Sequence, residues 1–155
     1  MCIRDSAWDK SVKYQLVYDA GYQPYKSAIS VRSGDLSGMS GCLKALVPVM
    51  QQADLDYLAD PGKVNDLILD LVDQYDTGWV YSKGVADYSV KTQKELGLVG
   101  NGGDGTHGNF DTARVQTLID QSTPIFTEQG SAPKSGLTPD DLVTNEFIDP
   151  AIGLK

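Results

Sequence analysis

The chain is short of cationic side chains and has no long apolar run. It has 13 Lys and Arg residues and 21 Asp and Glu residues, which gives a net charge of −8. Binding to a phosphate backbone needs clustered cations, and no basic cluster occurs, so the composition excludes a typical nucleic-acid partner. Uninterrupted apolar stretches span only a few residues, against the ~20 of a transmembrane helix. We therefore expect no membrane insertion.

Motifs that carry catalysis or hold a cofactor are also missing. The sequence has no Gly-x-Ser-x-Gly elbow, no His-Glu-x-x-His pair and no Cys-x-x-Cys. Cys42 stands apart from any histidine or second cysteine and is expected to be a small buried hydrophobic residue. His107, the single histidine, is expected to be exposed in a flexible glycine-rich loop over residues 99–109, where a general base has no rigid site. We expect no enzymatic activity, no cofactor and no metal site.

The first six residues differ in character from the rest. Residues 1–6, Met-Cys-Ile-Arg-Asp-Ser, resemble a translated sequencing-adapter remnant, so we expect a non-native leader there and a natural sequence that begins near Ala7 or Trp8. The alternative is an authentic unstructured N-terminus. No cationic start leads into an apolar segment, so the pattern of a signal peptide is absent from this sequence.

Residue periodicity predicts two strands near the start. Residues 12–18 alternate apolar and polar side chains and are rich in β-formers. Residues 27–32 form the second predicted strand, with Ile29 and Val31 on one face. Two strands are too few to be stable alone, so we expect them to need further partners.

After Gly34 the apolar spacing becomes helical. Four helices are predicted, with kinks at Pro48 and Pro124, over residues 41–58, 61–75, 80–96 and 111–128. Asp60 is expected to cap the second of them, with Pro61 at its first position. Thr138 and Asp141 have the spacing of a capping box and predict one more short helix start.

Four tyrosines gather around the first predicted strand and the turn after it, namely Tyr14, Tyr18, Tyr22 and Tyr25. Loops at strand ends are frequent ligand sites, and tyrosine offers a flat apolar ring with a polar tip. Packing of the strand explains the same residues equally well.

Three stretches together resemble a known family: residues 18–25 (YDAGYQPY), 28–32 (AISVR) and 42–53 (CLKALVPVMQQA). They are similar to the C-terminal half of ABC-transporter substrate-binding proteins of the nitrate, sulfonate, taurine and thiamine-precursor group. Asp60-Pro61 and residues 144–148 also fit, so the resemblance covers about residues 7–152. It implies an α/β protein, a fragment of a type II periplasmic-binding-protein fold with two strands followed by four or five helices.

In that fold residues 7–40 would supply strands and a crossover of the second lobe, and residues 41–155 a helical part that returns to the first lobe. The implied function is capture of a small polar or heteroaromatic solute, in the periplasm or lipid-anchored outside the cell, and its delivery to an ABC transporter permease.

The same resemblance places the turn after the first strand at the ligand cleft. Tyr18 and Tyr22 would stack on a flat ligand, and Gly21 would let the backbone approach it closely. Asp19 would accept a hydrogen bond from an amino group, which argues against nitrate or sulfonate and for an amine-bearing pyrimidine.

Two other functions stay open. Pyrimidine-precursor synthases share the implied architecture, but they look to depend on a Cys-rich motif that this sequence lacks. Alternatively, the chain is a self-contained acidic helical interaction module. That hypothesis requires no further lobe but leaves two strands with exposed edges, which is an aggregation liability.

Overall fold

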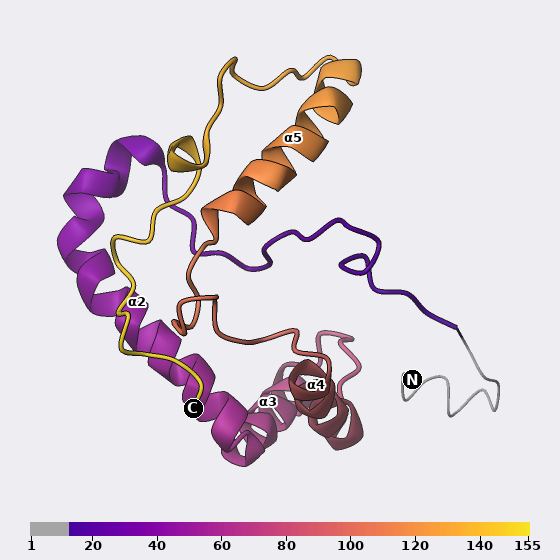
Figure 1. Ribbon diagram of the computed structural model, residues 1–155. Helices are drawn as coiled ribbons and strands as arrows, with labels where there is room; N and C mark the ends of the chain where they lie inside the picture. The colour runs from indigo at the N-terminus through magenta and orange to yellow at the C-terminus, as the bar shows by residue number, and fades with distance from the viewer. Residues whose placement is uncertain (1–12) are drawn as a thin grey trace.

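Helices joined by irregular segments make up residues 13–155, the part of the chain that the computed structural model describes (Figure 1). In chain order the elements are the 3₁₀ turn η1 (Ser33–Asp35), the helices α2 (Leu36–Ala59), α3 (Gly62–Tyr75), α4 (Lys83–Glu95) and α5 (Thr112–Glu128), and the 3₁₀ turn η2 (Pro139–Asp141). Among these residues, no helix is both long enough and apolar enough to span a bilayer.

The predicted α/β architecture is wrong for the described residues. No strand occurs between residues 13 and 155, and the only β-type contact there is an isolated bridge between Asn101 and His107. The first predicted strand runs instead into a turn, where the Asp19 amide donates to the Leu16 carbonyl at 3.0 Å; its first residue, Val12, lies outside the described residues. The two predicted strands do not pair, and an unpaired strand leaves its backbone groups unsatisfied. The two-strand fragment of a type II periplasmic-binding-protein fold is therefore not formed.

The predicted helices agree better with the structure. α2 begins at Leu36 rather than residue 41 and continues through Pro48, and α3 is preceded by Pro61 in the N-cap position that we expected for Asp60. The predicted capping box is confirmed: the Asp141 carboxylate accepts the backbone N–H and the hydroxyl of Thr138, both at 2.9 Å. Hydrogen bonding by this carboxylate fixes the start of η2.

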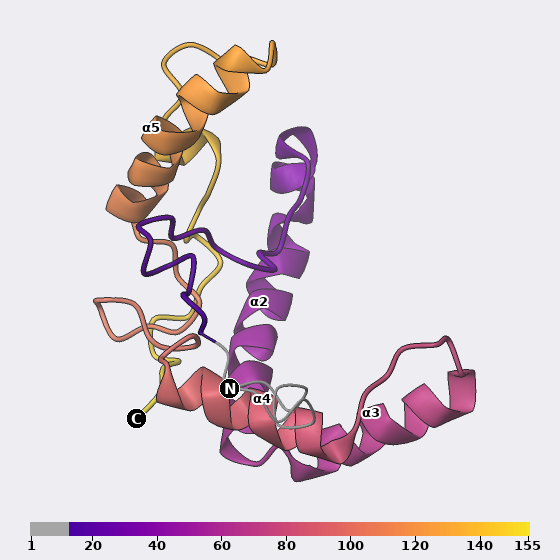
Figure 2. The same ribbon diagram turned by 90° about the vertical axis from the view of Figure 1, so that its right-hand side faces the viewer.

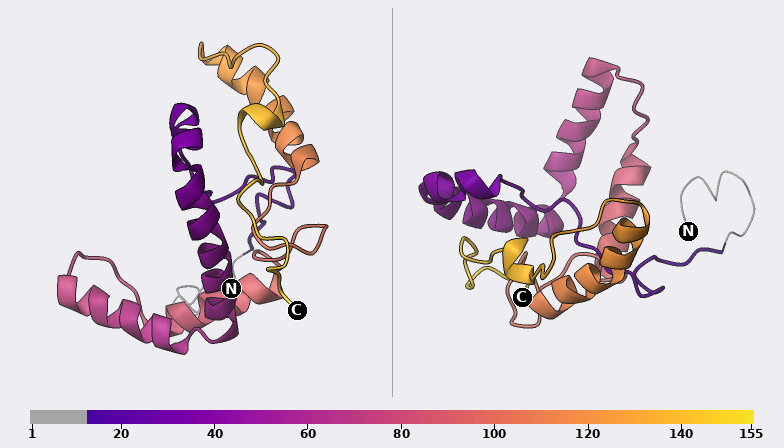
Figure 3. Two further views of the ribbon diagram at one scale, coloured as in Figure 1. Left: turned by 90° about the vertical axis from the view of Figure 1, so that its left-hand side faces the viewer. Right: turned by 90° about the horizontal axis from the view of Figure 1, so that it is seen from above.

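The helices do not close around one core. The C-terminal segment runs beside α2, and α3 and α4 form a hairpin that projects away from the rest (Figures 2 and 3). The buried apolar side chains are few and lie on several elements: Leu43, Leu58, Ala86, Val90, Val115, Ile119 and Phe147. Large apolar side chains are instead open to solvent, among them Val80, Val49 and Trp79, which are 79, 64 and 58% exposed. Much apolar surface is therefore in contact with solvent.

The helix α3 illustrates this exposure. Its apolar stripe, which we call the α3 stripe, consists of Val64, Leu67, Leu71 and Tyr75, which are 42, 56, 38 and 67% exposed. The buried position of this helix is instead polar: Asn65 is 1% exposed. Its Oδ1 accepts the Tyr57 hydroxyl at 2.9 Å, while its Nδ2 has no hydrogen-bond partner among residues 13–155. Burial, with Tyr81 nearby, raises the pKa of Tyr57.

Candidate functional site

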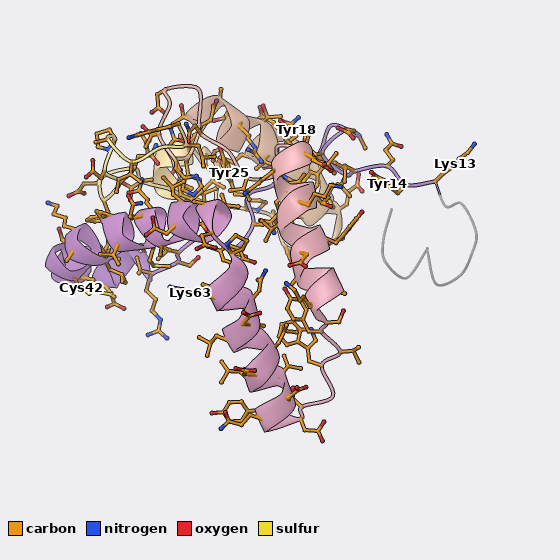
Figure 4. All side chains as sticks on the ribbon, turned by 90° about the horizontal axis from the view of Figure 1, so that it is seen from below. Lys13, Tyr14, Tyr18, Tyr25, Cys42 and Lys63 are labelled. Atoms are coloured by element: carbon orange, nitrogen blue, oxygen red, sulfur yellow. The ribbon has the colours of Figure 1, made fainter. Side chains whose placement is uncertain are left out.

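Residues 18–25, which we call the tyrosine segment, lie along the beginning of α5. The Tyr25 hydroxyl accepts the backbone N–H of Asp111, the N-cap of α5, at 2.8 Å. Further along the helix, the Gln121 side chain donates to the Gly21 carbonyl at 3.1 Å. In Figure 4, Tyr18 and Tyr25 lie over the body of the molecule, whereas Tyr14 lies further out along the chain. Two attachment points therefore align the tyrosine segment with the helix.

Arg114 is the central contact between the two elements. Its Nε donates to the Gln23 carbonyl at 2.7 Å and its Nη2 to the Pro24 carbonyl at 3.0 Å. The guanidinium lies 4.1 Å from the ring centroid of Tyr25 and 5.7 Å from that of Tyr18. Such stacking of a cation on an aromatic face is attractive. Phe110 supports the cluster from the side, because its ring meets Tyr25 edge to face at 4.9 Å.

The charge of Arg114 has no carboxylate partner among the described residues. It also lies in the first turn of a helix, where the macrodipole disfavours a cation by about 0.3–1 kcal/mol. Its two backbone acceptors and the tyrosine faces offset that cost. Sequence reasoning missed this residue, although a lone arginine in the first turn of a predicted helix is an available signal.

The four predicted ligand residues stay open to solvent. Tyr18 and Tyr22 are 50 and 45% exposed, and Asp19 makes no side-chain hydrogen bond or ion pair with the described residues. Gly21 has φ +91°, a conformation that strains any residue with a Cβ. The structure thus brings Tyr18 to Arg114, whereas the side chains of Asp19 and Tyr22 make no hydrogen bond with the described residues.

Two shallow hollows occur elsewhere, beside the start of α2. One, of about 370 Å³, lies between Leu36, Thr112 and the stretch 143–145, and the other, of about 290 Å³, lies between Leu36 and Phe147. None of the predicted ligand residues lines either hollow. Within residues 13–155, no three His, Cys, Asp or Glu side chains come together in a way that could hold a metal ion.

The glycine-rich loop is not the free loop that the sequence predicts. His107 is 6% exposed, and its Nε2 lies 3.0 Å from Oδ2 of Asp54 on α2. A carboxylate only accepts hydrogen bonds, so in the neutral ring the proton belongs on Nε2. The Nδ1 atom is buried and has no hydrogen-bond partner within the described part of the chain. The prediction of an exposed histidine is therefore wrong, and so is that of a buried Cys42, which is exposed.

Gln51, buried in α2, joins this loop to the end of the chain. Its amide donates to the carbonyls of His107 and Asp149, at 2.7 and 3.3 Å, and its Oε1 accepts the Asp149 N–H at 2.9 Å. The His107 N–H in turn donates to the Ile152 carbonyl at 2.9 Å. Loop, helix and chain end are thereby held as one unit.

Comparison with known proteins adds no family to this description. No protein-family model matches the chain, and neither the search of curated proteins nor the search of solved structures finds a similar protein.

Proposed function

We propose that this chain captures a small polar or heteroaromatic solute outside the cytoplasm for delivery to the permease of an ABC importer, and that it performs no chemistry on it. One observation carries the proposal. The tyrosine segment is fixed on α5 by Arg114 and Gln121, while the rings of Tyr18 and Tyr22 remain about half exposed. An aromatic surface that is already ordered loses little conformational entropy when a ligand binds.

The resemblance of residues 18–25, 28–32 and 42–53 to substrate-binding proteins supports the same function. The proposal does not depend on the strands, which are absent from the described residues; it depends on the tyrosine segment.

The ligand that fits this surface is flat and carries an amino group. Among the described residues, the Tyr22 ring stacks on no other aromatic side chain, and its flat face suits a heteroaromatic ring. The Asp19 carboxylate has no hydrogen-bond or ion-pair partner within residues 13–155, and it attracts an ammonium or amino group and repels anions.

Isothermal titration calorimetry with three probes tests the proposal: 4-amino-2-methylpyrimidine, taurine and nitrate. We expect saturable binding of the aminopyrimidine, weakened by up to about tenfold in Tyr22→Ala because an aromatic pair contributes 0.5–1.5 kcal/mol. Asp19→Asn should weaken it as well. Tyr14→Ala is the matched control, since Tyr14 is 62% exposed but lies outside the tyrosine segment. Absence of binding by all three probes, or equal affinity in every variant, contradicts the proposal.

A second function, the acidic helical interaction module, is favoured by the α3 stripe. The stripe is exposed, and Asp66, Asp70 and Asp73 lie on the polar side of the same helix. Apolar contact with charge complementarity suits a cationic amphipathic helix, whereas a second copy of this chain carries the same charge of −8.

A synthetic helix with one leucine stripe bordered by lysines tests this second function. We expect it to bind, and a version with glutamates in place of the lysines to bind more weakly. Leu67→Ser should weaken binding and Leu142→Ser should not, since both leucines are 56% exposed and only Leu67 lies on α3. Equal binding by the two peptides argues against the module.

A further inference from the structure

Asn101 is followed by Gly102, the sequence in which an asparagine side chain is most open to attack by the next backbone nitrogen. Glycine has no side chain to shield that nitrogen, and its backbone reaches conformations closed to other residues. Asn101 is itself exposed to solvent. Asn101 therefore has two features that favour spontaneous deamidation, a following glycine and exposure to solvent.

Leu154 forms hydrogen bonds with both the oxygen and the nitrogen of the Asn101 side-chain amide. The Asn101 Oδ1 accepts the Leu154 N–H at 2.7 Å, and the Nδ2 donates to the Leu154 carbonyl at 2.8 Å. The Gly102 N–H, from which the attacking nitrogen must arise, donates to the Thr106 carbonyl at 2.8 Å. Reaction thus requires that two or three hydrogen bonds break first.

We propose that Asn101 is a deamidation site guarded by residues 149–155, which we call the tail, and that its conversion releases the tail irreversibly. The Gly102 nitrogen forms a bond to Cγ of Asn101, and the Cγ–Nδ2 bond breaks. The Gly102 proton goes to the departing nitrogen, which leaves as ammonia. Water then opens the succinimide ring to aspartate or isoaspartate, so that no oxidant or further reactant is needed.

The product cannot rebuild the original contact. A carboxylate replaces the amide, so the donor to the Leu154 carbonyl is lost and two oxygen acceptors face each other. Isoaspartate also lengthens the backbone at residue 101, beside the bridge between Asn101 and His107. Without Asn101, the hydrogen bonds of the tail to Gln51 and His107 are too few to hold it closed, and the Ile152 contact with the His107 N–H opens as well.

A substitution at a glycine of the tail displaces the tail while Asn101 and Gly102 themselves stay unsubstituted. A Cβ at Gly153 would collide with the Gly105 carbonyl oxygen and would lie 3.3 Å from Nδ2 of Asn101. Gly153→Ala therefore forces the tail away from the loop. Gly103→Ala is the matched control, because a Cβ there meets nothing within 4 Å and the loop keeps its contacts.

The test incubates the full chain at neutral pH and measures amide-to-acid conversion at each asparagine by peptide mass spectrometry. We expect Gly153→Ala to accelerate conversion at Asn101 by about tenfold or more, since each hydrogen bond lost is worth a few-fold to tenfold in equilibrium. Gly103→Ala should match the unmodified sequence. Asn145 serves as the internal reference, because general unfolding would accelerate its conversion as well.

Equal conversion at Asn101 in the unmodified sequence and in Gly153→Ala overturns the guarding role, and so does a parallel rise at Asn145. Asn101→Asp tests the consequence separately. We expect faster hydrogen exchange at the Leu154 and His107 amides in this variant, and unchanged exchange at both overturns the release of the tail.

Discussion

Removal of the Arg114 guanidinium should detach the tyrosine segment from α5. Arg114→Met keeps much of the apolar stem but removes the donors to Gln23 and Pro24 and the cation stacked on Tyr25. Each hydrogen bond from a charged group contributes about 1.5–3 kcal/mol. The partial exposure of the side chain and the relief of the macrodipole both lower the total, so we expect a net loss of about 2–4 kcal/mol.

Hydrogen exchange at the Asp111 amide reports this detachment directly, because that N–H donates to the Tyr25 hydroxyl. A loss of this size predicts faster exchange by about 30-fold or more. Arg114→Lys should have an intermediate effect, since an ammonium cannot serve two carbonyls and stack at once. Lys91→Met is the control, because Lys91 pairs with Glu95 on the surface of α4, away from the tyrosine segment. Unchanged exchange at Asp111 in Arg114→Met refutes the role assigned to this arginine.

Three further predictions concern the helical frame. Gln51→Leu should destabilise the chain by about 2–4 kcal/mol in urea unfolding, because it leaves three backbone groups unpaired. Tyr57→Phe should cost about 1–3 kcal/mol by leaving the Asn65 side chain wholly unpaired, and adding Asn65→Leu should restore most of that loss. A hydrogen bond from Lys134, with others from Thr138, lowers the pKa of Asp141 to about 2. The cap of η2 should therefore be complete above the ordinary pKa of 3.8 and be lost as the pH falls through about 2. Proton NMR over this pH range measures that transition.

Each of these three predictions has a control variant or an outcome that would contradict it. Gln52→Leu is the control for the buried glutamine, because Gln52 is exposed and its side chain donates to Asp56 one turn along the same helix. Equal effects of the two changes contradict the first prediction. For the Tyr57 and Asn65 pair, simple addition of the two losses contradicts the second. An Asp141→Asn chain that keeps the same acid transition in η2 contradicts the third.

The helices were predictable because apolar spacing and local caps act over a few residues. Asp111 accepts the Arg114 N–H and Ser82 the Val85 N–H, each within one turn. Strands could not be predicted in the same way, because residues with high β-propensity form a strand only where a partner strand supplies the hydrogen bonds of the ladder. Residues 13–18 and 27–32 have the composition of strands and no such partner within the described chain.

The candidate site was predictable only in part, because its contacts join residues that lie far apart in the sequence. Tyr18 and Tyr22 could be chosen from composition, but Arg114 lies some ninety positions from the carbonyls that hold it. The buried setting of His107 depends on Asp54 and Ile152, far away on both sides in the sequence. A glycine-rich composition favours a free loop, but long-range hydrogen bonds hold this loop against α2 and residues 149–152.

Two-dimensional NMR of the chain, titrated with 4-amino-2-methylpyrimidine, tests solute capture by the tyrosine segment most directly. We expect saturable shifts at the amides of Tyr18, Asp19 and Tyr22 and in the first turn of α5, with a midpoint that moves to an up to about tenfold higher ligand concentration in Tyr22→Ala. Shifts centred on the hollow beside Thr144, or no saturable shift at any amide, would contradict capture of this ligand class by the tyrosine segment.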